Sequence, residues 1–313
     1  MAPEDTALAA ADPVSLVSAG DVAAIEAEAR RLGRGSPTLR AVALSAGLAL
    51  FCFLVVGVVA SLGLLTGLLG DVAGLSWIVI GPVWLYRGFQ QDSAERLGEV
   101  IGQLTRQTTI EEARATRESL QAMPRWTGLS APIRPLMLLC YGDILSQMGE
   151  WAAAERTYDL FLQQRVKWKG ARYATLVGKA QASWASCVAL QGQRFEPFAL
   201  PDLSALPEDT RHGIRHADVM SRAVLALRHG SEEDAQKLLE QELRHESPGE
   251  FVSQRMATRL LLAFTRARRG GSFRTPAPLD EDLARWIAQG RFDHLGTHWP
   301  ELRGYLDSLR AAG

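Results

Sequence analysis

Residues 41–86, AVALSAGLALFCFLVVGVVASLGLLTGLLGDVAGLSWIVIGPVWLY, decide how this chain is organised. The run contains a single carboxylate, Asp71, and no Lys, Arg or His. About 20 apolar residues already cross a bilayer as a helix. The longer run, with its glycine-rich middle, therefore predicts two membrane spans folded into a transmembrane helical hairpin over residues 41–87.

The basic residues that flank this run predict its orientation. Cytoplasmic flanks of membrane spans carry an excess of Lys and Arg, and both flanks are arginine-bearing here, whereas the connecting loop has no basic residue. We therefore expect an integral protein of a plasma membrane or bacterial inner membrane, with both termini cytoplasmic and the lipid bilayer as one of its partners. The flanking arginines are Arg30, Arg31, Arg34 and Arg40 before the run, and Arg87, Arg96 and Arg106 after it.

Small residues recur at helical spacing within the run. Gly57 and Ser61 form one such pair, and Gly63 and Gly67 form another. This spacing lets two helix backbones approach closely in lipid. The pairs indicate either packing of the two spans on each other or a face for a homo-oligomer or another membrane protein.

The segments around the hairpin have simpler patterns. Residues 1–19 lack periodicity and predict a disordered tail, and residues 20–40 predict a short amphipathic helix. Residues 88–129 predict juxtamembrane helices. In the second of these, Thr109 and Glu112 have the spacing of a capping box, and Pro124 ends the helix.

From residue 130 onward the chain reads as helical hairpins. The clearest is LCYGDILSQMGEWAAAERTYDLFL at residues 139–162. It resembles a tetratricopeptide repeat (TPR), a helix–turn–helix unit of about 34 residues. The resemblance implies that Gly142 is the small residue where two helices touch, that Gly149 makes the turn, and that Tyr158 packs back on the first helix. Trp151 and Ala154 occupy two further motif positions, whereas Phe161 and Val166 depart from the motif.

The later units resemble the motif less closely. A helix pattern followed by glycine and polar residues recurs at Gly192, Gly230, Gly270 and Gly290. Ala223, Ala235 and Leu239 stand at motif-like positions around Gly230, but prolines interrupt the segment after Gly192. Further helices are expected over residues 280–289 and from Pro300. The predicted fold class is all-α, a transmembrane helical hairpin followed by a TPR-like α-solenoid domain over residues 130–313, in which each hairpin contacts only its neighbours.

Composition and motifs exclude several function classes. The net charge of −1 gives no overall field for nucleic acid. Three well-separated cysteines match neither a disulfide framework nor metal spacing. No phosphate-binding loop, nucleophile elbow or dinucleotide fingerprint is present, so we predict a non-enzymatic protein without a cofactor or metal.

The alternative hypothesis is a metal-binding site, and it depends on histidines at helical spacing. Asp209, His212 and His216 could share one helix face as two histidines and a carboxylate, but the glutamate of a zincin motif is missing. His294 and His298 have the same spacing, with Gly296 between them. We prefer a polar helix face for the first set and expect no common face for the second.

The resulting functional hypothesis is a membrane-anchored scaffold or adaptor that presents its helical domain to another protein at the cytoplasmic face. The TPR resemblance implies partner contacts on the first helix of the unit, at Asp143, Ser146 and Gln147. A basic helix face is the second candidate surface, formed by Arg255, Arg259 and Arg266. The alternative is an accessory or regulatory subunit of a membrane transport or pore-forming complex, held through the small-residue faces of the hairpin.

Overall fold

The structure is a computed structural model, and it describes the helical domain and a few isolated residues before it. All secondary structure in the described part of the chain is helical, which confirms the all-α prediction for these residues. The described residues are 91–104 except 93, 109–122, 133–163, 171–193, 206, 208–244, 252–270 and 280–312, together with 27, 47, 51, 54 and 55.

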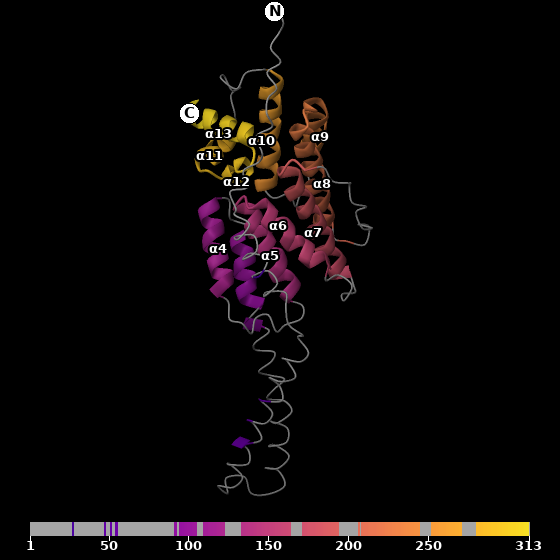
Figure 1. Cartoon of the computed structure of the whole chain (residues 1–313), viewed down its shortest axis with the longest axis vertical. Coiled ribbons are helices and arrows are strands. Elements are labelled where there is room, and N and C mark those ends of the chain that lie inside the picture. Colours follow the sequence, from indigo (N-terminus) through magenta and orange to yellow (C-terminus); the bar gives the residue numbers. More distant parts are fainter. Residues whose placement is uncertain are drawn as a thin grey trace, which may run out of the picture.

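The helices follow one another along the chain with short described turns between several of them (Figure 1). Residues 91–104 form the first described helical stretch. The later helices are α4 (Ile110–Ala122), α5 (Ile133–Gln147), α6 (Trp151–Gln163), α7 (Ala171–Leu190), α8 (Glu208–Arg228), α9 (Glu232–Arg244), α10 (Val252–Arg269), α11 (Glu281–Ala288), α12 (Asp293–Gly296) and α13 (Pro300–Ala312).

Local sequence signals set several helix starts. The capping box before α4 is confirmed, since the Glu112 amide donates to Thr109 Oγ1 at 3.2 Å and the Thr109 amide donates to Glu112 Oε2 at 3.1 Å. Asp280 caps α11 by accepting a bond from the Leu283 amide at 2.9 Å. Pro300 begins α13, where its missing amide hydrogen costs nothing because a first-turn amide has no helical partner.

Four glycines end helices in the left-handed conformation. Gly149, Gly192, Gly230 and Gly290 have φ of 78°, 75°, 79° and 73°. Around each, the glycine amide donates to the carbonyl three residues back and the next amide donates to the carbonyl five residues back. This double bond pattern is the Schellman motif, which satisfies the last carbonyls of a helix. Gly270 follows α10 without a positive φ, so it does not end that helix in the same way.

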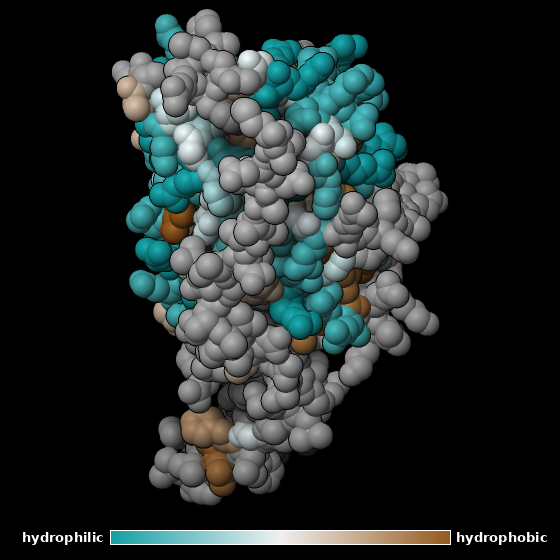
Figure 2. Space-filling view, turned by 45° about the horizontal axis from the view of Figure 1, so that its top comes forward, coloured by the Kyte–Doolittle hydropathy of each residue, from teal (hydrophilic) through white to brown (hydrophobic). Residues whose placement is uncertain are grey.

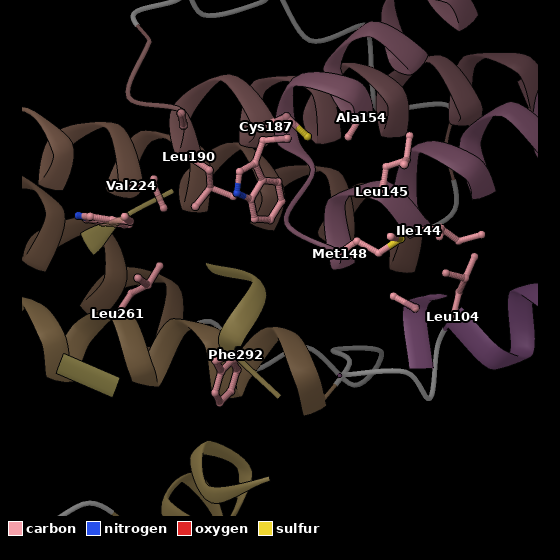
Figure 3. Close-up of a cluster of buried hydrophobic side chains, with 14 of the residues drawn as sticks. Leu104, Ile144, Leu145, Met148, Ala154, Cys187, Leu190, Val224, Leu261 and Phe292 are labelled. Carbon is pink, nitrogen blue, oxygen red and sulfur yellow. The ribbon is translucent and has the colours of Figure 1, made fainter. Parts of the chain in front are cut away.

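Consecutive helices from α5 to α10 each pack on the next, as in a helical repeat array. α4 lies beside α5, and α11 and α13 pack together next to α10 (Figure 1). One continuous apolar core joins these helices and the helical stretch 91–104. Figure 3 shows part of it, where Leu104, Leu145, Leu190, Val224 and Phe292 come from widely separated elements.

The hairpin of α5 and α6 has the helix contact that the repeat resemblance implied. A Cβ on Gly142 would lie 2.6 Å from Cε1 of Tyr158, so only glycine lets the tyrosine ring reach the α5 backbone. Tyr158 is 1% exposed and Ala154 is fully buried. The two helices therefore meet through an aromatic ring that lies on a glycine.

The end of the chain returns to this first hairpin. A Cβ on Gly149 would lie 2.8 Å from Thr297 Cβ and 3.2 Å from the His294 carbonyl oxygen. Arg228 of α8 donates to the His298 carbonyl at 3.2 Å, and its guanidinium lies 5.3 Å from the centre of the Trp299 ring. The prediction that each hairpin contacts only its neighbours is therefore wrong for α5 and α6, because tertiary packing brings the α12–α13 segment onto their turn.

The predicted membrane hairpin falls almost wholly outside the described residues. Within the described part of the chain, no helix is long and apolar enough to cross a bilayer. The few described residues of the 41–87 run include Phe51, Leu54 and Val55, which are 63%, 57% and 45% exposed. The predicted tail over residues 1–19 lies outside the described residues, and of the predicted helix over 20–40 only Ala27 is described, as helical.

Candidate functional site

A groove of about 460 Å³ runs between the helices of the domain. Its lining comes from the helical stretch 91–104, from α5, α7, α8 and α10, and from the segment containing α11 and α12. Most lining side chains are apolar, such as Leu104, Leu139, Leu176, Met220 and Phe292. By contrast, the described outer surface is mainly hydrophilic in the view of Figure 2. The groove is therefore an apolar feature of a domain whose described surface in that view is mainly hydrophilic.

An ion pair lies in the groove wall between α5 and α7. Lys179 Nζ donates to Asp143 Oδ2 at 2.7 Å, and the Tyr158 hydroxyl donates to Asp143 Oδ1 at 2.7 Å. The nearby carboxylate raises the pKa of Lys179. Burial, and then the Asp143 charge, raise the pKa of Tyr158 well above its usual value. The three groups therefore form a hydrogen-bonded set with no net charge at neutral pH.

The cysteines of the domain are not activated nucleophiles. Cys140 lines the groove, and burial, followed by the nearby Asp143 charge, raises its pKa to about 12. Burial also raises the pKa of Cys187 well above its usual value. A nucleophilic cysteine needs a lowered pKa to supply thiolate at neutral pH. Both side chains act as small apolar groups of the core.

The histidines of α8 have separate surroundings. His216 Nδ1 lies 2.8 Å from Glu242 Oε1 of α9, and both side chains are buried. His212 Nε2 is buried without a hydrogen-bond partner, and the side chain of Asp209 lies outside the described ones. No group of three potential metal ligands occurs among the described residues. His216 therefore pairs with a carboxylate that the metal hypothesis did not include.

The C-terminal part of the groove wall carries a second cation and a histidine. The Arg291 guanidinium lies 4.4 Å from the centre of the Trp286 ring, and its Nε donates to Gln289 Oε1 at 2.7 Å. His294 lies beside Trp151 of α6, with ring centroids 6.0 Å apart. Burial lowers the pKa of His294 to about 4, so this side chain is neutral at pH 7.

The predicted partner residues of α5 make internal hydrogen bonds. Besides the pair formed by Asp143, the Ser146 hydroxyl donates to the Asp143 carbonyl at 2.8 Å. Gln147 Nε2 donates to the Leu104 carbonyl at 3.5 Å, and its Oε1 is buried without a partner. Asp143 and Gln147 line the groove, but none of the three is fully exposed. Their role in binding stays a prediction.

The predicted basic face on α10 is partly neutralised. Arg259 pairs with Asp280 at 2.8 Å, and Arg266 pairs with Glu240 of α9 at 3.1 Å. Arg255 is partly buried, with its Nε away from solvent. Only Arg266 of the three is fully exposed. The three arginines of α10 therefore have different surroundings, although the sequence suggested one uniform basic face.

The predicted helix-packing residues Gly57, Ser61, Gly63 and Gly67 lie outside the described residues. Sequence reasoning missed that Lys179 and Arg291 line the groove, and it considered His294 only as a metal ligand together with His298. The available signal was weak: Lys179 follows Asp143 by 36 positions, close to the length of one repeat, which places both on first helices of successive units.

Comparisons with known proteins identify no relative. No protein-family model, no curated protein and no solved structure matches this chain.

Proposed function

We propose that this protein is a membrane-anchored scaffold whose TPR-like helical domain binds a partner protein at the cytoplasmic face of a membrane. The observation that carries the proposal is the stack of antiparallel helices in which Tyr158 lies on Gly142. Stacked helical hairpins form a rigid extended surface, and such surfaces are used for protein recognition.

The membrane anchor in this proposal rests on the sequence between Ala41 and Arg87. Two spans fit within the run, and the arginines on both sides favour cytoplasmic termini. The exposed Phe51, Leu54 and Val55 side chains support it, because exposed large apolar groups are favourable where lipid surrounds them.

The exposed part of α10 is the proposed partner surface. Arg259 and Arg266 bridge to α11 and α9 through Asp280 and Glu240. The side chain of Arg259 is 35% exposed and that of Arg266 is 60% exposed, so both remain accessible to an acidic partner. Charged groups at a rim change partner choice and association rate more than stability.

The experiment is a crosslinked co-purification of the full chain from its native membrane. The double variant Arg259→Glu/Arg266→Glu is compared with Gly63→Leu/Gly67→Leu and with Arg285→Glu. Arg285 is the matched control, since its side chain is also exposed, at 62%, and also pairs with a carboxylate. We expect the α10 variant to lose the partner and the other two to keep it.

Loss of the partner only in the Gly63→Leu/Gly67→Leu variant would overturn the proposal, because recognition would then lie in the bilayer. That result is the one expected of an accessory subunit of a transport or pore-forming complex. Retention of the same partner by all three variants would exclude the α10 surface.

A further inference from the structure

We propose that the groove between the helices binds a long-chain fatty acid, with its alkyl chain among the apolar side chains and its carboxylate against Arg291. This inference goes beyond the scaffold proposal and does not depend on it. It rests on the size of the groove, on its polar groups and on its charge.

The volume of the groove fits a small molecule. Its volume of about 460 Å³ lies within the range of roughly 300–1,000 Å³ that is usual for small-molecule sites. Side chains from both ends of the described domain line it, including Leu104 before α4 and Leu295 of α12. An open array of hairpins would leave its inner surface as a shallow trough, whereas here the C-terminal segment adds a wall.

Several polar groups of the lining already bond to one another or to nearby protein groups, whereas Gln147 Oε1 is buried without a partner. Asp143 accepts from both Lys179 and Tyr158. The Ser186 and Ser221 hydroxyls lie 2.8 Å apart, and each also lies within hydrogen-bond distance of a carbonyl one turn earlier, so two hydroxyl hydrogens are shared among three contacts. A peptide strand would bring amide and carbonyl groups that need new partners. An alkyl chain needs none, and each buried methylene contributes about 0.8 kcal/mol.

The charge of the lining points to an anion. The ion pair of Lys179 with Asp143 cancels, and His216 is bonded to Glu242. His294 is neutral at pH 7. Among the described lining residues, the cation without a carboxylate partner is Arg291.

The setting of Arg291 suits a carboxylate. Its guanidinium is held against the Trp286 ring, and toward the described residues it donates only from Nε, in the bond to Gln289. The terminal nitrogens can donate two parallel bonds, which is the geometry that arginine offers to a carboxylate. A fatty acid satisfies this cation and the apolar lining with one molecule.

The test uses photoactivatable hexadecanoic acid, with a diazirine in its chain, added to the full chain in phosphatidylcholine nanodiscs. Labelled peptides are mapped by mass spectrometry. We expect labels on α7 and α8, and displacement by unlabelled hexadecanoic acid. Labels confined to residues 41–87 would overturn the proposal, since they would report only partition into the lipid around the hairpin.

Variants test the groove and the carboxylate separately. Ala217→Trp and Ala257→Trp each fill the groove from a different helix, and Ala152→Trp, at an exposed position of α6, is the matched control. We expect about a tenfold loss of α7 and α8 labelling in either groove variant that keeps its thermal unfolding transition, and no loss in the control. Unchanged labelling in these groove variants would contradict the proposal.

Arg291→Gln, compared with Arg285→Gln, tests the anion contact. We expect several-fold weaker labelling by the acid in Arg291→Gln only, and no change with a photoactivatable hexadecanol. Equal labelling by the alcohol and the acid in the parent chain would overturn the carboxylate assignment. Labelling by a photoactivatable phosphatidylcholine in place of the free acid would show that a phospholipid chain is the occupant and would likewise overturn it.

Discussion

The hairpin of α5 and α6 and the hairpin of α8 and α9 have different residues at the two corresponding positions of the repeat motif. In the first, Gly142 faces Tyr158, and a Cβ on the glycine would lie 2.6 Å from the ring. In the second, Ala223 and Leu239 stand at the corresponding positions, and both are fully buried. In these two hairpins the smaller residue of the first helix thus accompanies the larger residue of the second.

The two hairpins also differ in what lies against their turns. Gly149 and Gly230 have nearly the same φ, 78° and 79°. A Cβ on Gly149 would meet Thr297, whereas one on Gly230 would meet nothing within 4 Å. Nearly equal backbone geometry thus occurs once under a second layer of protein and once at a turn where no described residue would meet an added Cβ.

The largest predicted effect comes from removal of the ring on the first hairpin. Tyr158→Ala should lower the free energy of unfolding by about 4 kcal/mol, because a fully buried aromatic leaves a cavity. Tyr158→Phe should cost only about 1 kcal/mol, because Asp143 loses one donor and keeps Lys179. Urea denaturation of the full chain, followed by circular dichroism, measures the loss of unfolding free energy in each variant. Equal losses in the two variants would contradict the prediction that the ring contributes more than the hydroxyl.

The matched turn glycines give the next effect. Gly149→Ala should destabilise the protein by about 3 kcal/mol, from left-handed strain plus the clash with Thr297. Gly230→Ala should cost about 1 kcal/mol, since strain alone acts there. The difference between the two losses of unfolding free energy reports how tightly the C-terminal segment packs on the turn of the first hairpin. Equal losses would mean that this packing does not resist an added methyl group.

Exchange of the paired residues tests whether the side-chain sizes at positions 142 and 158 depend on each other. Gly142→Ala should cost about 2 kcal/mol through overpacking against Tyr158. The double variant Gly142→Ala/Tyr158→Leu recreates the pair found in α8 and α9, and it should be less unstable than the sum of its single changes. Additive losses in the double-mutant cycle would show that the two positions do not interact as described.

The smallest effect is a pH dependence of stability that comes from His294 of α12, which lies against Trp151 of the first hairpin. The folded-state pKa of His294 is about 4, below the ordinary value of 6.5, so the unfolded chain binds the proton first and stability falls as pH drops through this window. Between pH 7 and 5 we expect a loss on the order of 1 kcal/mol. His294→Gln should flatten the profile of unfolding midpoint against pH, and an unchanged profile would exclude this histidine as the cause.

Sequence patterns predicted much of the local structure. The capping residue Thr109, a helix over residues 280–289, the start of α13 at Pro300 and the turn at Gly149 were all predicted, because each depends on groups within a few residues. The contact of Gly142 with Tyr158 was implied by the repeat resemblance. The groove was not predicted, because its wall combines Leu104, Lys179 and Arg291 from distant parts of the chain.

Sequence alone determined that the described domain is helical, where several of its helices begin and end, and which hairpin meets through a glycine. These features depend on short-range hydrogen bonds and on apolar periodicity, both of which are written in neighbouring residues. Only the tertiary structure decided that Thr297 lies on the turn at Gly149, that Asp143 pairs with Lys179, and that Arg291 has no carboxylate partner within the described part of the chain. Those outcomes depend on how whole helices stack, and the repeat-length spacing of Asp143 and Lys179 is the one trace of this packing that we find in the sequence.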